Sequence, residues 1–378
     1  MPKITLIGAG SHVFARRLIG DALTWPSLAS STICLMDLNQ RKLDLMAALA
    51  RKMVKTLGVA AQIEATTDLR TALRGADYVI VSIRVSDSDA HVSVPLKYGI
   101  DQAVGDTNGP GAAFYFLKNA PAVIQTAKMM QEECPHALML NYTNPMVMLS
   151  WAVHLLAPIK FVGLCHSVQG TARDMARYAG IPYEEVTYWA AGINHMAWFL
   201  EFNWKKQDAY PLLFKAMQDK EIYEHDVVKF EVMKHFGAFV SESSIHCSEY
   251  LPYFRRTPEL IDRYVKPTMW GVGAKGETRE QRRARYAEQR AAAEAELVRL
   301  ATTDDPLTVE RSHEFCTYIL NAIETNVPYS FNGNVWNTGL ITNLLPNSVV
   351  EVPILVDGCG LHPCYVGDLP PALAALNR

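Results

Sequence analysis

The chain has 378 residues, 49% of them hydrophobic and 20% charged, a composition typical of a globular protein. Lys and Arg total 36 against 39 Asp and Glu, and no basic patch is interleaved with aromatics, so we expect no nucleic-acid partner. No apolar run reaches the roughly 18 residues of a membrane span, so we expect no membrane partner. The seven cysteines are scattered without paired spacing and no signal peptide is visible, which predicts a cytoplasmic protein with reduced thiols.

The first 37 residues have the pattern of a dinucleotide-binding βαβ unit. A short apolar strand at 4–7 leads into the turn Gly8-Ala9-Gly10-Ser11, a helix is expected at about Val13–Leu23, and a second strand ends at Asp37. The glycines would let the backbone approach a pyrophosphate at the helix N-terminus, and Asp37 would accept hydrogen bonds from the adenosine ribose. We therefore predict Gly8, Gly10, Ser11 and Asp37 as contacts of NAD rather than NADP.

The fingerprint is incomplete, because Val13 occupies its third glycine position. The alternative is a tight turn beside an ordinary aspartate that ends a strand.

Strands alternate with helices up to about residue 170, which favours a doubly wound parallel sheet of the Rossmann type. Further strands are predicted at 63–66, 78–83, 137–142 and 159–164, and helices at 41–57, 69–74 and 112–133. Ser82 lies near the end of one of these strands and is predicted as a further cofactor contact. Asn144 follows another and could offer its amide to a nicotinamide or a sugar hydroxyl, although a plain turn explains Asn144-Pro145 equally well.

Beyond residue 170 the pattern becomes α+β. We expect an antiparallel strand at 198–204, helices at 210–220, 226–236 and 278–301, a turn at Asn332-Gly333-Asn334 and a strand at 349–353. The chain is accordingly divided into a Rossmann-type NAD-binding domain, 1–170, and an α+β catalytic and substrate- or metal-binding region, 171–378.

A thiol and an imidazole mark the main candidate for chemistry. Cys165 ends the strand at 159–164, where ligands bind in open α/β sheets, and His195 belongs to a second polar cluster, Gly192-Ile193-Asn194-His195. Two protein ligands would leave coordination positions open, as catalytic metal ions require. The alternative is a buried cysteine and a histidine with ordinary hydrogen bonds.

Two other positions allow a functional and a structural interpretation. Asp106 lies in a glycine-rich loop and is either a turn former or a functional carboxylate. The tyrosines of the segment 246–256 could pack in the core. Close to a divalent cation, however, a phenol's pKa falls from about 10 and tyrosine then serves as a base.

Six motifs in order resemble glycoside hydrolase family 4, the glycosidases that depend on NAD and a divalent metal. The motifs are Ile4–Ser11, Asp106–Gly111, Asn141–Met146, Cys165–Thr171, Gly192–Met196 and Glu249-Tyr250, and the similarity continues through 349–357 and 360–369. The family loop usually has a glycine where Ala112 stands, and the chain has a shorter C-terminus than family relatives.

The resemblance implies a mechanism in which NAD removes a hydride from sugar C3 and later returns it. A metal held by Cys165 and His195 would polarise the resulting ketone, and Tyr250 would remove the C2 proton before the aglycone leaves and water adds. Asp106 and His166 are both candidates for proton transfer to the leaving oxygen. Asn144, His166 and Asn194 are expected to contact the substrate. A thiolate alone would favour zinc or iron, whereas the resemblance implies Mn²⁺.

Within the family, His166-Ser167 after Cys165 resembles the α-galactosidase (melibiase-like) branch, because phosphosugar enzymes usually carry Asp or Asn there and α-galacturonidases tend to Cys-His-Glu. The expectation is an α-galactosidase that acts on small α-glycosides as a homodimer or homotetramer. The alternatives are an α-galacturonidase or another α-glycosidase of the family and, from other classes, an NAD-dependent hydroxy-acid dehydrogenase or a non-catalytic NAD sensor.

Overall fold

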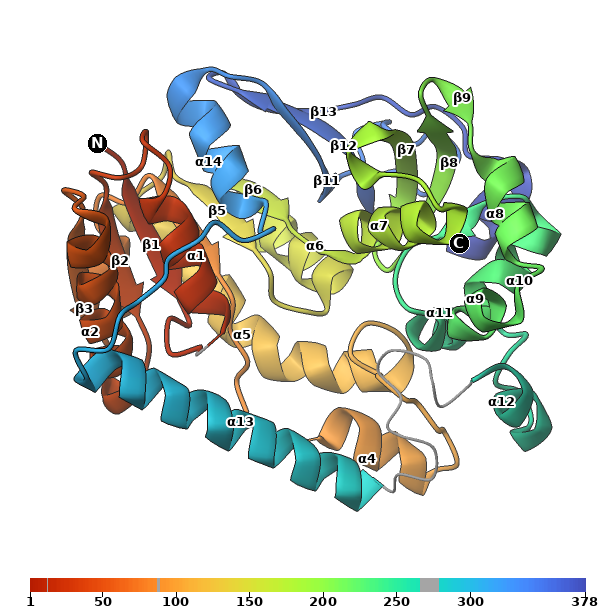
Figure 1. Ribbon diagram of the computed structural model, residues 1–378, viewed down its shortest axis with the longest axis horizontal. Coiled ribbons are helices and arrows are strands. Elements are labelled where there is room, and N and C mark those ends of the chain that lie inside the picture. The colour runs from red at the N-terminus through yellow and green to blue at the C-terminus, as the bar shows by residue number, and fades with distance from the viewer. Residues whose placement is uncertain (12, 87–88, 266–278) are drawn as a thin grey trace.

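One mixed β-sheet runs through the whole molecule (Figure 1). The computed structural model describes residues 1–11, 13–86, 89–265 and 279–378. Within these ranges the strand order is β10-β8-β7-β12-β11-β6-β5-β4-β1-β2-β3, with β13 beside β12 and β9 beside β8. No helix of this described part is both long and apolar enough to cross a membrane.

The first part of the chain forms the parallel end of the sheet, as predicted. Its elements are β1 (Lys3–Ile7), α1 (Phe14–Leu23), β2 (Thr32–Met36), α2 (Gln40–Leu57), β3 (Gln62–Thr66), α3 (Leu69–Leu73), β4 (Tyr78–Val81), α4 (Ala90–Lys97), α5 (Gly109–Glu133), β5 (Leu138–Asn141), α6 (Met146–Leu156) and β6 (Lys160–Gly163). Strands β3-β2-β1-β4-β5-β6 all pair in parallel, which confirms the doubly wound Rossmann-type fold.

Both faces of this parallel sheet are buried. Leu6 and Leu35 belong to the core cluster that contains residues of α1 and α2, whereas Met36, Val79 and Val81 belong to the cluster that contains residues of α3, α5 and α6. With helices on both faces, the carboxyl ends of the strands form the open edge of the sheet, where ligands bind.

The second part of the chain extends the same sheet with antiparallel strands and adds helices at its far end. Its elements are α7 (Ser167–Ala179), the short 3-10 helix η1 (Tyr183–Glu185), β7 (Val186–Ile193), β8 (Met196–Trp204), β9 (Gln207–Asp208), α8 (Tyr210–Ala216), α9 (Lys220–His225), α10 (Val227–Phe236), β10 (Phe239–Val240), α11 (Ser244–Tyr250), α12 (Pro258–Tyr264), α13 (Arg279–Thr302), α14 (Cys316–Thr325), β11 (Tyr329–Trp336), β12 (Val349–Asp357), β13 (Gly360–Pro363) and α15 (Pro371–Asn377). The α+β character predicted for this region is confirmed.

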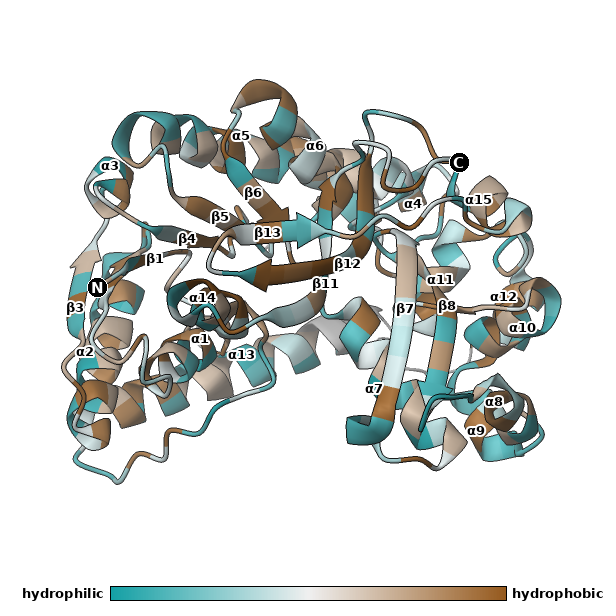
Figure 2. Cartoon of the chain, turned by 90° about the horizontal axis from the view of Figure 1, so that it is seen from above, coloured by the Kyte–Doolittle hydropathy of each residue, from teal (hydrophilic) through white to brown (hydrophobic). Residues whose placement is uncertain are grey.

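The turn predicted at residues 332–334 is wrong, because these residues lie in the middle of β11. Gly333 pairs with Val352 of β12, and a Cβ at Gly333 would lie 2.8 Å from Ile354 Cδ1. The glycine therefore serves close packing rather than a turn. The amide of Asn332 donates to the Ala190 carbonyl (2.7 Å), so this polar side chain also links strands. Figure 2 shows the hydrophobic strand β12 at the centre of the molecule.

The helix predicted at 210–220 is two helices, α8 and α9. Asp219 begins the second, because its carboxylate accepts hydrogen bonds from the backbone N–H groups of Glu221 (2.8 Å) and Ile222 (3.2 Å). The long helix α13 lies along α2 (Figure 1), where Arg41 and Glu294 form an ion pair of 2.6 Å.

Candidate active site

The glycine turn after β1 is shaped by two close approaches. Gly8 has φ +89°, and a Cβ on it would lie 2.2 Å from the Ser82 carbonyl oxygen. A Cβ on Gly10 would lie 2.7 Å from Asp37 Oδ2, which accepts a hydrogen bond from the Gly10 N–H (2.8 Å). Gly8 therefore requires glycine, whereas a side chain at Gly10 would displace the Asp37 carboxylate. The turn, with Ser11 at its end, and the half-buried Asp37 carboxylate lie together at the N-terminal end of α1.

A cavity of about 230 Å³ opens beside this turn at the carboxyl edge of the parallel strands. Its lining residues are Phe14, Ser82, Tyr142, Asn144, Met146, Leu164, Cys165 and His166. Asn144 Oδ1 is buried in this wall and accepts no hydrogen bond from the described residues. Buried acceptors normally receive a hydrogen bond, so Asn144 Oδ1 is available to a donor group of a ligand.

Cys165 and His195 come together, as the sequence predicted. Cys165 lies between β6 and α7, His195 lies at the turn between β7 and β8, and His195 Nε2 is 3.1 Å from Cys165 Sγ. Burial, reinforced by the charges of Glu351 and Glu242, raises the pKa of Cys165 to about 12. The free thiol is therefore protonated at neutral pH, and a metal ion would have to displace its proton.

Glu242 is a third member of this group that the sequence did not reveal. Its Oε2 lies 3.8 Å from His195 Nε2, and one donor atom from each of Cys165, His195 and Glu242 lies within 4.8 Å of the others. Burial opposes ionisation of the carboxyl, but the charges of His195 and His246 outweigh it and hold the pKa of Glu242 well below its usual range.

Thr107 connects the remaining polar side chains. Its Oγ1 accepts a hydrogen bond from the Tyr250 hydroxyl (2.7 Å) and lies 2.7 Å from His246 Nε2 and 3.3 Å from His195 Nδ1. Asp106 Oδ1 lies 3.3 Å from His246 Nε2. We call the seven residues Asp106, Thr107, Cys165, His195, Glu242, His246 and Tyr250 the polar cluster. It contains four of the predicted site residues, and burial raises the pKa of Tyr250 above its ordinary value.

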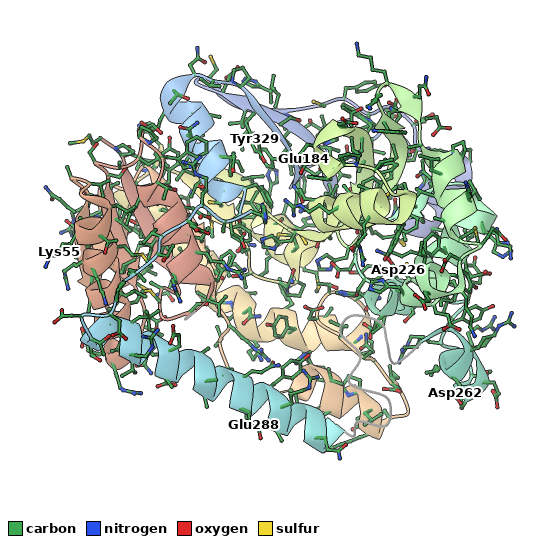
Figure 3. The ribbon with its side chains drawn as sticks, in the orientation of Figure 1. Lys55, Glu184, Asp226, Asp262, Glu288 and Tyr329 are labelled. Carbon is green, nitrogen blue, oxygen red and sulfur yellow. The ribbon has the colours of Figure 1, made fainter. Side chains whose placement is uncertain are left out.

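Two further acids, Glu249 and Asp226, anchor the helix α11, which carries part of the polar cluster. The Glu249 carboxylate accepts hydrogen bonds from the backbone N–H groups of Ala103, Val104 (2.8 Å) and Gly105 (3.0 Å), which ties α11 to the loop that carries Asp106. Asp226, labelled in Figure 3, accepts a hydrogen bond from Ser244 Oγ (2.5 Å) at the start of α11 and pairs with Lys229 (2.7 Å). These contacts hold the helix that carries His246 and Tyr250.

Asn194 lies next to His195 and is fully enclosed. Its Nδ2 donates to Glu351 Oε2 on β12 (3.2 Å), while its Oδ1 is buried without a hydrogen-bond partner among the described residues. Glu351 is buried too, and burial raises its pKa to about 7. The pair supports the turn that carries His195.

His166 lies apart from Tyr250 and Asp106, on the cavity side of Cys165. Its Nε2 is 2.5 Å from Glu314 Oε2, and its ring stacks on Tyr142 with the ring centres 5.5 Å apart. The two predicted candidates for proton transfer to the leaving oxygen have different surroundings: Asp106 lies against His246 in the polar cluster, and His166 pairs with Glu314 in the cavity wall.

Comparison with known proteins covers nearly the whole chain. Residues 3–181 match the Family 4 glycosyl hydrolase model, and residues 190–378 match the Family 4 glycosyl hydrolase C-terminal domain. The chain is 38% identical to an alpha-galactosidase of Bacillus subtilis (strain 168), covering 100% of the chain and 86% of the relative. It is 36% identical to an alpha-galactosidase of Rhizobium meliloti (strain 1021), covering 99% of the chain and 77% of the relative.

Solved structures show the same fold. The Bacillus subtilis protein lplD superposes with a TM-score of 0.84 at 26% identity, covering 100% of this chain and 89% of that one. A 6-phospho-alpha-glucosidase from gut microorganisms, solved with NAD and Mn²⁺, has a TM-score of 0.79 at 19% identity and covers 99% and 86%. The chain belongs to family 4 of the glycosyl hydrolases.

Proposed function

We propose that the protein is an α-galactosidase that works with NAD and a divalent metal ion, with Mn²⁺ as the preferred ion. The observation that carries the proposal is the meeting of Cys165 and His195, 3.1 Å apart, at the wall of the cavity beside the glycine turn. The two alpha-galactosidases that are 36% and 38% identical over nearly the whole chain support the reaction and the sugar.

The charges around the site favour a neutral sugar. Acids, histidines, tyrosines and the Cys165 thiol supply the ionisable groups of the polar cluster and the cavity wall, and neither set, as drawn from the described residues, contains a lysine or an arginine. A phosphate or a carboxylate on the sugar would need such a cation. This argues against a 6-phosphosugar, and against the galacturonide cleaved by a relative from Thermoanaerobacter italicus that is 28% identical.

The residues around the glycine turn fit NAD. Gly8, Gly10 and Ser11 would receive the pyrophosphate, Asp37 the ribose, and Ser82 and Asn144 the nicotinamide end, where Asn144 Oδ1 lacks a partner among the described residues. NAD bound there would supply a hydride acceptor that returns the hydride, so the reaction has no net oxidation.

Cys165 and His195 fit a catalytic metal site, because a thiolate and an imidazole leave positions open for sugar oxygens. An ion bound there would supply Lewis-acid polarisation and would lower the pKa of the nearby Tyr250 phenol. Tyr250, held by Thr107 at 2.7 Å, would then remove the C2 proton. Asp106, which faces the same polar cluster, would protonate the leaving oxygen, while His166, Asn144 and Asn194 would bind the substrate.

We propose that residues 1–170 supply the NAD site together with Cys165 of the metal site, that residues 171–378 complete the substrate and metal site with His195, Asn194 and Tyr250, and that the protein works in the cytoplasm as a homodimer or homotetramer. All seven cysteines are free thiols, which supports a reducing compartment.

Hydrolysis of p-nitrophenyl α-galactoside with and without NAD, Mn²⁺ and a thiol reductant tests the function. We expect cleavage only when all three are present, with solvent deuterium entering C2 of the released galactose. The α-glucoside, the α-galacturonide and a 6-phosphosugar glycoside serve as controls for the sugar. A normal rate after both NAD and metal are stripped would contradict the proposal, as would net NADH formation from a hydroxy acid without metal.

A further inference from the structure

The side chain of Glu242 is directed at the same point as Cys165 Sγ and His195 Nε2. Metal bonds of about 2.0 to 2.3 Å place neighbouring donor atoms about 3 to 4 Å apart. The distances from His195 Nε2 are 3.1 Å to Cys165 Sγ and 3.8 Å to Glu242 Oε2. Both separations fall within the range that a shared ion requires, and the three donor atoms all lie within 4.8 Å of one another.

The two oxygens of Glu242 have different surroundings. Oε1 accepts a hydrogen bond from the Ser243 N–H (3.1 Å) and lies 3.8 Å from His246 Nδ1. Oε2 faces His195 Nε2, the nitrogen next to the thiol. His195 Nδ1 lies 3.3 Å from Thr107 Oγ1, so Thr107 orients the imidazole from its other nitrogen, as the outer partner of a metal-binding histidine does.

The backbone at Glu242 is unfavourable for a glutamate. Its φ is +78°, and the other described non-glycine residues with positive φ are Lys205, Lys206, Asn326 and Asn347, all of them exposed. A left-handed φ costs conformational energy for a glutamate. Residues strained in this way cluster at functional sites, where the position of the side chain matters.

We propose that Glu242 is a third protein ligand of the divalent ion, together with Cys165 and His195. A carboxylate oxygen is the hard donor that suits Mn²⁺, whereas a thiolate and an imidazole alone favour zinc or iron. Thiolate and carboxylate together also neutralise the charge of a divalent ion, which lowers the cost of placing it among partly buried side chains. This inference rests on the proposed function, because it assumes that Cys165 and His195 bind a metal.

Mn²⁺ binding measured without any sugar tests the proposal. The chelator-stripped, reduced, full-length protein with NAD is titrated with MnCl₂, and the free Mn²⁺ is followed by its electron paramagnetic resonance signal. We expect Glu242→Gln and Glu242→Gly to raise the Kd for Mn²⁺ roughly tenfold or more, and Glu242→Asp to raise it less. The ratio of Zn²⁺ to Mn²⁺ affinity should increase in Glu242→Gly, because only the softer donors remain.

The glycine variant separates loss of a ligand from loss of the fold. Glycine accepts φ +78° without strain, so Glu242→Gly should stay folded, with a melting temperature within about 3 °C of the wild type. Glu314→Gln is the matched control, because Glu314 is an even more buried carboxylate that pairs with His166 and not with Cys165 or His195. It should leave Mn²⁺ affinity unchanged.

The outcomes distinguish this proposal from the proposed function. Unchanged Mn²⁺ affinity in folded Glu242→Gly, combined with weak binding in Cys165→Ala and His195→Ala, would remove Glu242 from the site and leave the function standing. Wild-type protein that binds Mn²⁺ only after sugar is added would also overturn the third ligand. If Glu242→Gly, Cys165→Ala and His195→Ala all bound Mn²⁺ as tightly as the wild type, the metal site itself would be overturned, and with it the proposed function.

Discussion

The two sides of Cys165 are built in different ways. On one side, the glycine turn and Asp37 belong to one contiguous βαβ unit, in which Gly10 N–H donates to Asp37 (2.8 Å) and the N–H groups of Gly8 and Ala9 donate to the Met36 carbonyl (2.9 and 3.0 Å). On the other side, the polar cluster collects residues from segments that lie between positions 106 and 250 and meet only through tertiary contacts. The part of the cofactor site proposed to bind the pyrophosphate and the ribose is thus contained in one supersecondary unit, whereas the polar cluster forms only when distant segments of the chain meet.

The largest expected effect is at the residue that both sides share. Replacing Cys165 with alanine should lower kcat/KM for an aryl α-galactoside by roughly 10³-fold or more, because the metal loses its thiolate and its polarising effect is worth several kcal/mol. NAD affinity, measured by fluorescence titration, should change little, because the glycine turn and Asp37 are intact. Full activity in this variant would remove Cys165 from the mechanism.

A change at Thr107 should affect the polar cluster alone. Thr107→Val keeps the shape but removes the hydroxyl that contacts Tyr250, His246 and His195, and we expect kcat/KM to fall by roughly 10- to 100-fold. Thr107→Ser restores the hydroxyl and should recover most of the activity. A serine variant as slow as the valine variant would mean that the methyl group, not the hydrogen bonds, matters.

A change at Asp37 should affect the proposed NAD site alone and leave the polar cluster unchanged. Asp37→Ala should weaken NAD binding about tenfold, the value of a hydrogen bond to a charged group, and should leave Mn²⁺ affinity unchanged. Asp44→Ala, which removes an exposed carboxylate from α2, is the control and should leave both affinities unchanged. Equal losses of NAD and Mn²⁺ affinity in Asp37→Ala would show that the two sides do not act separately.

The last expected effect concerns stability and pH and leaves both sites' affinities aside. Burial raises the pKa of Glu351 to about 7, above its ordinary 4.5, so the folded protein holds this proton more tightly than the unfolded chain. The contribution of Glu351 to stability is therefore present at low pH and is lost as the pH rises from 4.5 to about 7. In metal-free protein, Glu351→Gln should raise the free energy of urea unfolding by about 1–3 kcal/mol at pH 8 and not at pH 5. The same gain at both pH values would contradict burial as the cause.

The sequence predicted most of the parallel half, because apolar strands and periodic helices are local signals and alternate regularly there. It failed at Asn332-Gly333-Asn334, whose local preference is a turn, because packing against Ile354 and pairing with β12 decide the conformation. For the site, the polar residues that follow a predicted strand indicated the Cys165–His195 pair, and the resemblance to family 4 supplied the role of Tyr250.

Glu242, Thr107 and Glu249 could not be assigned roles from the sequence. Their contacts join positions far apart in the chain, such as Glu249 with Gly105 and Tyr250 with Thr107. No periodicity or spacing within one segment records such contacts, and the positive φ of Glu242 becomes visible only in the folded chain.

The continuity of the sheet has a mechanical consequence. Residue Gly163 of β6 pairs with Asn334 of β11, and Glu351 of β12 pairs with Gly192 of β7, so one hydrogen-bonded lattice runs from the strand before Cys165 to the strand before His195. Rotating one half of the molecule against the other would tear this lattice. The sheet therefore fixes the spacing between the glycine turn and His195. We therefore expect the sugar to enter a preformed site, in which its stereochemistry is selected without a hinge motion between the two halves.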